Sequence, residues 1–338
     1  MTSLESLKTP EDYAHLFNAD TQSLLSVLDA ANTVRQRHWG NLVTIHRINN
    51  AQNGYCPEDC SYCAQSKLAT TPIQSYGLKP DDEIINEAKQ AYENGAYRYC
   101  LVLSGRGPTP TKINRLTYII RRIKTLYPER EVCLSAGLLG HDMAVALKQA
   151  GLDRLNHNLN TTEDQYKTIC TTHSYADRMN TLIAAQNAGL ALCSGVIVGT
   201  GESSDDLIQL AFQLSALKVA SIPVNFLIPI PDTPFEHYNF LTPDYCLRVL
   251  ALFRLVNPEA EIRMAAGREY HLKSLQVMGL YAANSLFIDG YLNTAGSDYH
   301  DTVKLIQDAG FKIRGDQTPH PVSRSVSLKT ETELRPTR

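Results

Sequence analysis

The chain has 338 residues, of which 43% are hydrophobic and 20% are charged, as is typical of a globular protein. No apolar run is long enough to span a bilayer, and a net charge of -3 provides no overall basic surface for nucleic acid. These features argue against a membrane protein and against a nucleic-acid-binding protein. The N-terminal segment resembles neither a secretory signal nor a transit peptide, so we expect a cytoplasmic location.

The predicted elements begin with helix and then alternate between strand and helix. Residues 1 to about 40 form a helical extension, in which Asp20 to Arg37 carries apolar residues at helical spacing and Gly40 ends the run. Eight β-rich runs follow, at Leu42–Ile48, Tyr97–Ser104, Glu131–Ala136, Arg154–Leu159, Ala191–Val198, Ala220–Ile228, Glu261–Ala265 and Ser285–Leu292. Several of the intervening amphipathic helices end at a glycine, namely Gly95, Gly151, Gly189 and Gly310.

Eight strand–helix units predict an α/β fold of the (β/α)8 TIM-barrel type over residues 41–314. An open doubly wound sheet would have fewer strands and a Gly-rich first turn, neither of which is seen, and an incomplete barrel is the remaining alternative. The tail at 315–338 is rich in Ser, Thr, Pro and charge, so we expect it to be disordered. The predicted organisation is thus a helical extension (1–40), a barrel and a polar tail.

Eight cysteines without a secretory signal indicate reduced thiols that serve as ligands or nucleophiles. Cys56, Cys60 and Cys63 form a C-x3-C-x2-C loop just after the first predicted strand, and such dense thiolates suit zinc or an iron–sulfur cluster. A four-iron cluster held by three cysteines keeps one iron open to a substrate. The alternative is a zinc site completed by a distant Cys or His, although the paired C-x2-C half-site typical of zinc loops is missing.

A second set of polar or soft residues is distributed over six successive predicted strands, and would line one cavity if all its members point inward. Taken singly, each cysteine is well explained as a small buried hydrophobe, which is our interpretation of Cys170 and Cys246. An arginine among apolar strands needs a buried partner, which an anionic cluster would provide. The six residues are Cys100, Cys133, Asn158, Cys193, Asn225 and Arg263.

The cysteine spacing, with an aromatic residue directly before the last cysteine, resembles the signature of radical S-adenosylmethionine enzymes. Further segments, extending from about residue 40 to 295, are similar to the biotin synthase family. They are Gly54-Tyr55-Cys56-Pro57-Glu58-Asp59-Cys60-Ser61-Tyr62-Cys63-Ala64-Gln65-Ser66, Ser104-Gly105-Arg106-Gly107-Pro108, Asn156-His157-Asn158-Leu159-Asn160-Thr161, Cys193-Ser194-Gly195 with Gly199-Thr200-Gly201-Glu202, and Arg263-Met264-Ala265-Ala266-Gly267-Arg268-Glu269.

The resemblance implies conversion of dethiobiotin to biotin, the last step of biotin biosynthesis, through a 5'-deoxyadenosyl radical made from S-adenosylmethionine. It assigns a 4Fe–4S cluster to the three loop cysteines and places Tyr62 near the adenine of the cofactor. It assigns a second, 2Fe–2S cluster, the sulfur donor, to Cys100, Cys133, Cys193 and Arg263.

The resemblance also implies substrate and cofactor contacts. Asn158 and Asn225 would contact substrate, Asn158 also the cofactor, and Asn160 stands where some members carry an Asp that binds ribose. The turn of Gly199 and Gly201 would approach the cofactor. Thr294 is a weaker substrate contact because the nearby Asp289-Gly290 replaces an expected Gly-Asp. An electron donor such as flavodoxin or ferredoxin and a homodimer are further expectations.

Two other functions remain open at this point. A different radical enzyme, such as a cluster-maturase relative, would share the cysteine loop but would not be expected to retain the three strand cysteines together with Arg263. A zinc-stabilised barrel that binds a ligand without catalysis would be colourless, whereas an iron–sulfur protein is brown.

Overall fold

The computed structural model describes residue 4 and residues 7–315. The segment 315–338, for which the sequence predicts disorder, lies outside the described residues except for Gly315. In chain order, with η for a 3₁₀ helix, the elements are α1 (Pro10–Tyr13), η2 (Ala14–Phe17), α2 (Leu24–Trp39), β1 (Leu42–Gln52), α3 (Asp81–Glu93), β2 (Arg98–Leu103), α4 (Pro110–Leu126), β3 (Glu131–Ser135), α5 (His141–Gln149), β4 (Arg154–Asn156), α6 (Glu163–Ile169), α7 (Tyr175–Asn187), β5 (Ala191–Cys193), β6 (Val196–Val198), α8 (Ser204–Ala216), β7 (Ser221–Phe226), α9 (Pro243–Val256), β8 (Glu261–Met264), α10 (Arg268–Leu272), η3 (Lys273–Tyr281), β9 (Ser285–Ile288), α11 (Tyr299–Asp308) and β10 (Lys312–Ile313).

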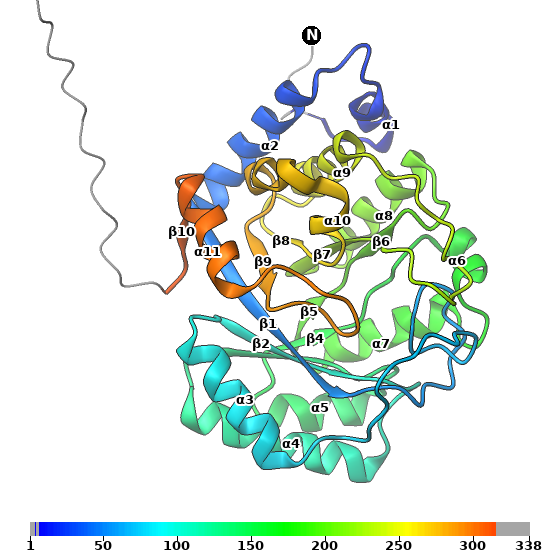
Figure 1. The fold of residues 1–338 in the computed structure, drawn as a ribbon, viewed down its shortest axis with the longest axis vertical. Coiled ribbons are helices and arrows are strands. Elements are labelled where there is room, and N and C mark those ends of the chain that lie inside the picture. Colours follow the sequence, from blue (N-terminus) through cyan, green and yellow to red (C-terminus); the bar gives the residue numbers. More distant parts are fainter. Residues whose placement is uncertain (1–3, 5–6, 316–338) are drawn as a thin grey trace, which may run out of the picture.

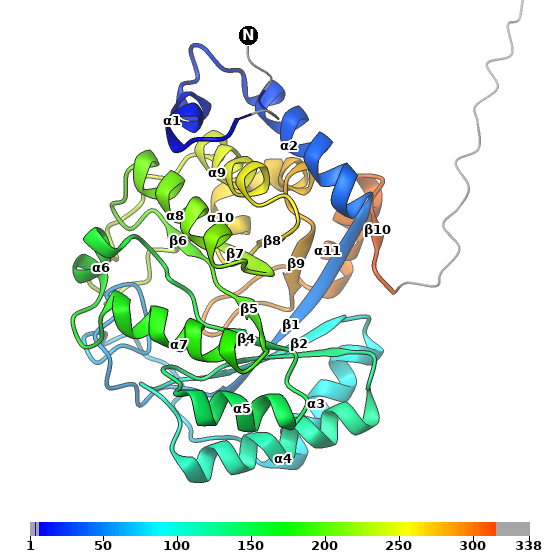
Figure 2. The ribbon, with the colours of Figure 1, turned by 180° about the vertical axis from the view of Figure 1, so that it is seen from behind.

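Parallel strands close into a barrel with the helices outside it, as Figure 1 and Figure 2 show from opposite sides. The order around the barrel is β1-β2-β3-β4-β5-β7-β8-β9, and the pairing of β9 with β1 closes it. β6 shares the position of β5, since both pair with β7, and β10 pairs only with the start of β1. The predicted (β/α)8 barrel is therefore confirmed, and the closing pair excludes an open or incomplete sheet.

The fifth strand position is interrupted, although the sequence predicts one continuous strand there. Asn158 enters the gap between β5 and β6, where its Oδ1 accepts from the backbone N–H of Gly195 at 3.1 Å. A Cβ on Gly195 would lie 1.9 Å from the carbonyl oxygen of Pro223, so only glycine fits this position. Because the strand is interrupted here, the N–H of Gly195 donates to Asn158, which lies in the loop after β4.

The fourth and eighth strands are shorter than predicted because the backbone leaves the ladder early. β4 ends at Asn156, and β9 ends at Ile288, directly before Asp289 and Gly290, which have φ values of 60° and 89°. A left-handed pair of residues cannot continue a strand. The residues that follow both strands are thus free to turn toward the barrel mouth.

The helical extension packs against the end of the barrel at which the strands begin. α2 starts at Leu24 rather than at the predicted Asp20, because Ser23 caps it by accepting from the N–H of Ser26 at 3.2 Å. α2 lies against α9 and η3. The four predicted helix stops, Gly95, Gly151, Gly189 and Gly310, all have φ between 77° and 96°.

None of the helices in residues 7–315 combines the length and the apolar character needed to cross a membrane. All eight cysteines lie within the described residues and are free thiols there, as expected for ligands rather than disulfides.

Candidate active site

The loop with the three clustered cysteines follows β1 at the end of the barrel where the strands end. Its first turn is closed by Gly54, whose N–H donates to Gln65 Oε1 at 2.9 Å. An antiparallel bridge between Asn53 and Tyr76 brings the chain back to β1. Figure 1 shows the loop beside α6, and the N–H of Ser61 donates to the carbonyl of Ile169 at 2.9 Å. The loop is therefore held by its own hydrogen bond, by the segment around Tyr76 and by the end of α6.

The three loop cysteines are half-buried and differ in their contacts. Burial raises the pKa of the Cys63 thiol to about 11, and the N–H of Gln65, which donates to Cys63 Sγ at 3.4 Å, offsets only part of that rise. Ligand atoms around one tetrahedral zinc ion lie about 3.8 Å apart, since Zn–S is about 2.3 Å. In the described chain, Cys56, Cys60 and Cys63 form no group with all ligand atoms within 4.8 Å. The three loop thiols are therefore not gathered at the spacing of ligands on one zinc ion.

A cavity of about 400 Å³ opens at this end of the barrel and joins the loop to the strands. Both predicted ligand sets and most of the predicted contact residues line it, whereas Gly199 and Gly201 do not. The predicted residues in its wall are Cys56, Cys60, Tyr62, Cys63, Cys100, Cys133, Asn158, Asn160, Cys193, Asn225, Arg263 and Thr294.

The strand cysteines form a group deeper in the same cavity. Cys100 and Cys133 are register partners on β2 and β3, and Cys193 ends β5. They are separate from the main apolar core and pack with Ala265 and Phe287. Three thiols gathered in one cavity wall are not explained by core packing at unrelated positions.

The electrostatic surroundings of this group favour thiolates. Hydrogen bonding from Cys133 lowers the pKa of Cys100 and of Cys193, and the guanidinium of Arg263 lowers both further. The same hydrogen bonds raise the pKa of the donor, Cys133. The amide of Asn156 adds a contact of 3.2 Å to Cys193 Sγ. Two of the three thiols are thus prepared to bind a cation or a metal cluster.

Arg263 is fully buried beside the strand cysteines and has unused hydrogen-bonding capacity. Its Nη2 donates to Glu261 and, at 2.8 Å, to Ser221 Oγ, while its Nη1 lies 3.9 Å from Cys193 Sγ. Its Nε has no hydrogen-bond partner among the described residues. An unpaired buried nitrogen is costly, so the residues fit a bound electron-rich group at this place.

A buried ionic network below Arg263 escaped the sequence analysis. Glu261 accepts from Arg98 at 3.0 and 2.8 Å and also binds Arg263, and these cations hold the pKa of its carboxyl well below the usual range. His46 Nε2 lies 2.9 Å from the same carboxylate. The sequence could have revealed this network, because residues two apart on a strand lie on the same face. Arg98 lies two residues before Cys100, and Glu261 lies two residues before Arg263.

Tyr62 and Asn160 contact each other across the cavity mouth. The Nδ2 of Asn160 donates to the hydroxyl of Tyr62 at 2.8 Å, and Asn160 has a φ of 71°. Asparagine tolerates this left-handed conformation better than most residues. The contact joins the cysteine loop to the segment after β4, the two parts that the sequence predicts to hold the cofactor.

Asn158 and Asn225 are engaged with backbone at the interrupted strand. Besides binding Gly195, Asn158 Oδ1 accepts from Asn156 Nδ2 at 3.2 Å. Asn225 donates to the carbonyl of Val196 at 3.0 Å and accepts from the N–H of Ala266 at 3.3 Å. Both amides are therefore held in fixed orientations while they face the cavity.

The turn of Gly199 and Gly201 lies apart from the cavity wall. The carboxylate of Glu202 accepts from the N–H groups of Gly199 and Thr200 at 2.6 and 2.7 Å, so the donors of the turn are already occupied. Thr294 reaches the wall from the loop after β9, next to Asn293, whose amide exchanges hydrogen bonds with Asn53.

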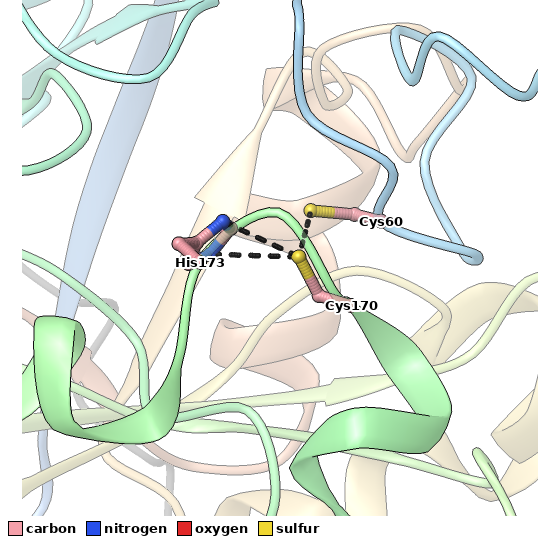
Figure 3. A group of neighbouring side chains, drawn as sticks. All are labelled: Cys60, Cys170 and His173. Carbon is pink, nitrogen blue, oxygen red and sulfur yellow. Dashed lines mark hydrogen bonds between the residues drawn. The ribbon is translucent and has the colours of Figure 1, made fainter.

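A further group at the cysteine loop includes Cys170, which is buried in the apolar core as the sequence analysis expects but also has polar contacts that the sequence does not reveal. Cys170 Sγ lies 3.8 Å from Cys60 Sγ and 3.3 Å from His173 Nδ1 (Figure 3). Hydrogen bonding between the two thiols raises the pKa of Cys60 and lowers that of Cys170. Spacing could not have shown this contact, since more than one hundred residues separate the partners.

Comparisons with known proteins agree with this barrel and site. Residues 53–214 match the model of the radical SAM superfamily, and residues 223–312 match the biotin and thiamin synthesis associated domain. The fold is similar to that of methylornithine synthase, with a TM-score of 0.80 at 20% identity over 92% of this chain and 96% of that one. A crystal structure of the FeFe-hydrogenase maturase HydG from Carboxydothermus hydrogenoformans also has a TM-score of 0.80, at 18% identity over 91% and 76%. The protein is thus a radical SAM barrel enzyme, a class that implies S-adenosylmethionine and a 4Fe–4S cluster.

The particular family follows from the sequence relatives. The chain is 55% identical to the biotin synthase of Acaryochloris marina over 87% of this chain and 84% of that protein. It is 53% identical to the biotin synthase of Magnetococcus marinus over 86% and 90%. The chain therefore belongs to the biotin synthase family, radical SAM enzymes of biotin biosynthesis.

Proposed function

We propose that this chain inserts sulfur into dethiobiotin to form biotin, with the two thiol sets as ligands of two different clusters. The observation that carries the proposal is that both sets, together with Arg263, line one cavity of about 400 Å³. In a shared cavity, a substrate bound beside one thiol set would also lie within reach of a group held by the other. Family membership alone does not assign these residues.

Cys56, Cys60 and Cys63 would hold the 4Fe–4S cluster at the cavity mouth. With S-adenosylmethionine bound, this cluster supplies a 5'-deoxyadenosyl radical. The residues of the chain keep the loop in place and position the cofactor, for which the Tyr62–Asn160 contact offers a hydroxyl and an amide. Gly199 and Gly201 are weaker cofactor contacts, because Glu202 already binds their turn.

Cys100, Cys133, Cys193 and Arg263 would hold the 2Fe–2S cluster, which supplies sulfur when bound. The donor set fits, since thiolates favour iron, Nη1 of Arg263 lies 3.9 Å from Cys193 Sγ, and its Nε has no partner among the described residues. Asn158, Asn225 and Thr294 would orient dethiobiotin, whose ureido ring can both donate and accept hydrogen bonds. Walls of Leu, Val and Ile around these residues limit water near reactive species.

Several expectations accompany this proposal. The one-electron chemistry requires a reducing partner, for which flavodoxin or ferredoxin is our prediction, and we propose a homodimer and a cytoplasmic location. We also propose the domain division into the helical extension (1–40), the barrel (41–314) and the tail (315–338).

The test is metal analysis of protein reconstituted without oxygen. We expect wild type to contain both clusters and no zinc, and the Cys133→Ala, Cys193→Ala double variant to lose about two irons. The matched control is Cys246→Ala, a buried thiol on α9, which should keep the full iron and sulfide content. Full iron in the double variant would show that these cysteines are core packing, and failure of wild type to take up iron even when zinc is absent would favour a ligand-binding barrel.

A further inference from the structure

Three possible metal ligands meet beside the cysteine loop in a group that the proposed clusters do not explain. Cys60 comes from the loop after β1, Cys170 follows α6, and His173 precedes α7, and all three side chains point toward one another (Figure 3). One ligand atom from each lies within 4.8 Å of the other two, and this is the one such group of three or more in the described chain.

The distances suit one tetrahedral ion. Cys60 Sγ and Cys170 Sγ are 3.8 Å apart, and Cys170 Sγ is 3.8 Å from His173 Nε2. Two thiolates on one zinc ion are separated by about 3.8 Å, and a thiolate and an imidazole nitrogen by about 3.5 Å. Two of the three ligand-to-ligand distances are therefore close to those around a zinc ion, and the third is within 4.8 Å.

The surroundings orient the imidazole as they do in zinc sites. His173 Nδ1 contacts the carboxylate of Glu58, and Arg178 donates to Nε2 at 3.0 Å. With its proton on Nδ1, toward Glu58, the imidazole presents its free electron pair at Nε2, in the carboxylate–histidine arrangement of zinc ligands. An ion at Nε2 would replace one hydrogen bond of Arg178, which keeps its contacts to Tyr166 and Asn158.

Charge and access also suit a cation. Two thiolates neutralise a divalent ion, and the carboxylate of Glu58 pairs with the guanidinium of Arg106 at 3.3 Å. Asp59 is fixed by the N–H groups after α6 at 2.8 and 3.1 Å, which also fixes Cys170. Cys60 and His173 line the cavity, so water can reach the fourth corner.

We propose that Cys60, Cys170 and His173 bind one thiophilic divalent ion, of the zinc type, when no cluster occupies the cysteine loop. Binding releases a proton from each thiol that is still protonated and involves no redox change. Because Cys60 would serve both groups, the ion and the 4Fe–4S cluster exclude each other, and this exclusion rests on the proposed function. Zinc then acts as a competitor of cluster assembly rather than as a part of the active enzyme.

The first test titrates reduced, metal-free full-length protein with Co²⁺, whose thiolate absorption reports the ligands, and then displaces it with Zn²⁺. We expect one ion in wild type, and an affinity more than tenfold lower in Cys60→Ser, Cys170→Ser and His173→Gln, because loss of even an outer partner costs about 10–100-fold. The matched control Cys63→Ser should keep the ion. Unchanged affinity in Cys170→Ser with loss in Cys63→Ser would overturn the proposal and assign the ion to the loop alone. Melting temperatures show that each variant is folded.

A second test separates this proposal from the proposed function. We expect iron and sulfide to build the first cluster in wild type and in Cys170→Ser, and prior loading with one equivalent of Zn²⁺ to block it in wild type only. If the Co²⁺ pattern holds but neither protein takes up iron, the cluster assignment fails and the zinc-type site stands. If Zn²⁺ blocked cluster assembly equally in wild type and in Cys170→Ser, Cys170 would not be a ligand of the competing ion and the proposal would be overturned.

Discussion

The two thiol sets lie in backbones of opposite character. The cysteine loop is irregular and half-buried, and it is held by scattered hydrogen bonds such as the 2.9 Å contact of Gly54 with Gln65. The strand cysteines lie on a regular parallel ladder and are buried above an ionic network. Perturbing the strand set should therefore affect the whole barrel, whereas perturbing the loop should have small, local effects.

The largest effect is expected from Glu261→Gln. The substitution leaves the guanidinium groups of Arg98 and Arg263 buried without their shared carboxylate. Breaking a buried ionic network in this way costs about 3–5 kcal/mol, which urea denaturation measures. The control is Glu83→Gln, at an ion pair with Lys79 in which the Glu83 side chain is 47% exposed, where a change of about 1 kcal/mol or less is expected. Similar losses in both variants would contradict the contrast between buried and exposed charge.

A smaller effect is expected from Gly195→Ala at the interrupted strand. The added Cβ would meet the carbonyl of Pro223 at 1.9 Å, so β7 must shift. Overpacking of this kind costs about 1–3 kcal/mol in unfolding free energy. In Gly77→Ala the new Cβ meets nothing within 4 Å and the residue caps no helix, so stability should hardly change. Tolerance of alanine at Gly195 would show that the strand break does not depend on close backbone approach.

The ionic network also predicts a pH dependence. Burial, and then the cation of Arg263, lower the pKa of His46 to about 3. The unfolded chain binds a proton at this residue near pH 6.5 and the folded chain does not, so stability falls as pH drops from about 6.5 toward 3. One such group contributes about 1.4 kcal/mol per pH unit within that window. His46→Gln should reduce this slope in urea denaturation between pH 6 and 5, and an unchanged slope would show that His46 is already protonated when folded. His237→Gln, at a side chain that is 90% exposed, is the control.

Sequence reasoning could recover the barrel because its periodic signals are local. The glycine stops and the alternation of strand and helix depend on neighbours in the chain, and they gave all eight strand positions. Spacing and strand period singled out the two sets of cysteines, whereas their assignment as cluster ligands comes from the family resemblance and stays a prediction. The strand break at Gly195 could not be found, because it depends on Asn158 and Pro223 from other strands. Cys170 could not be assigned for the same reason, since its partner Cys60 is distant in the chain.

The smallest effect is expected in the loop region, from Tyr62→Phe. The change removes the 2.8 Å hydrogen bond from Asn160 and leaves that amide, which is 3% exposed, without its partner. A single neutral hydrogen bond contributes about 0.5–1.5 kcal/mol, so a loss of about 1 kcal/mol in unfolding free energy is expected. Tyr55→Phe, at a side chain that is 76% exposed, should change nothing measurable. If Tyr62→Phe instead destabilised the protein as strongly as Glu261→Gln, the loop would be part of the cooperative barrel, and the contrast between the two thiol sets would fail.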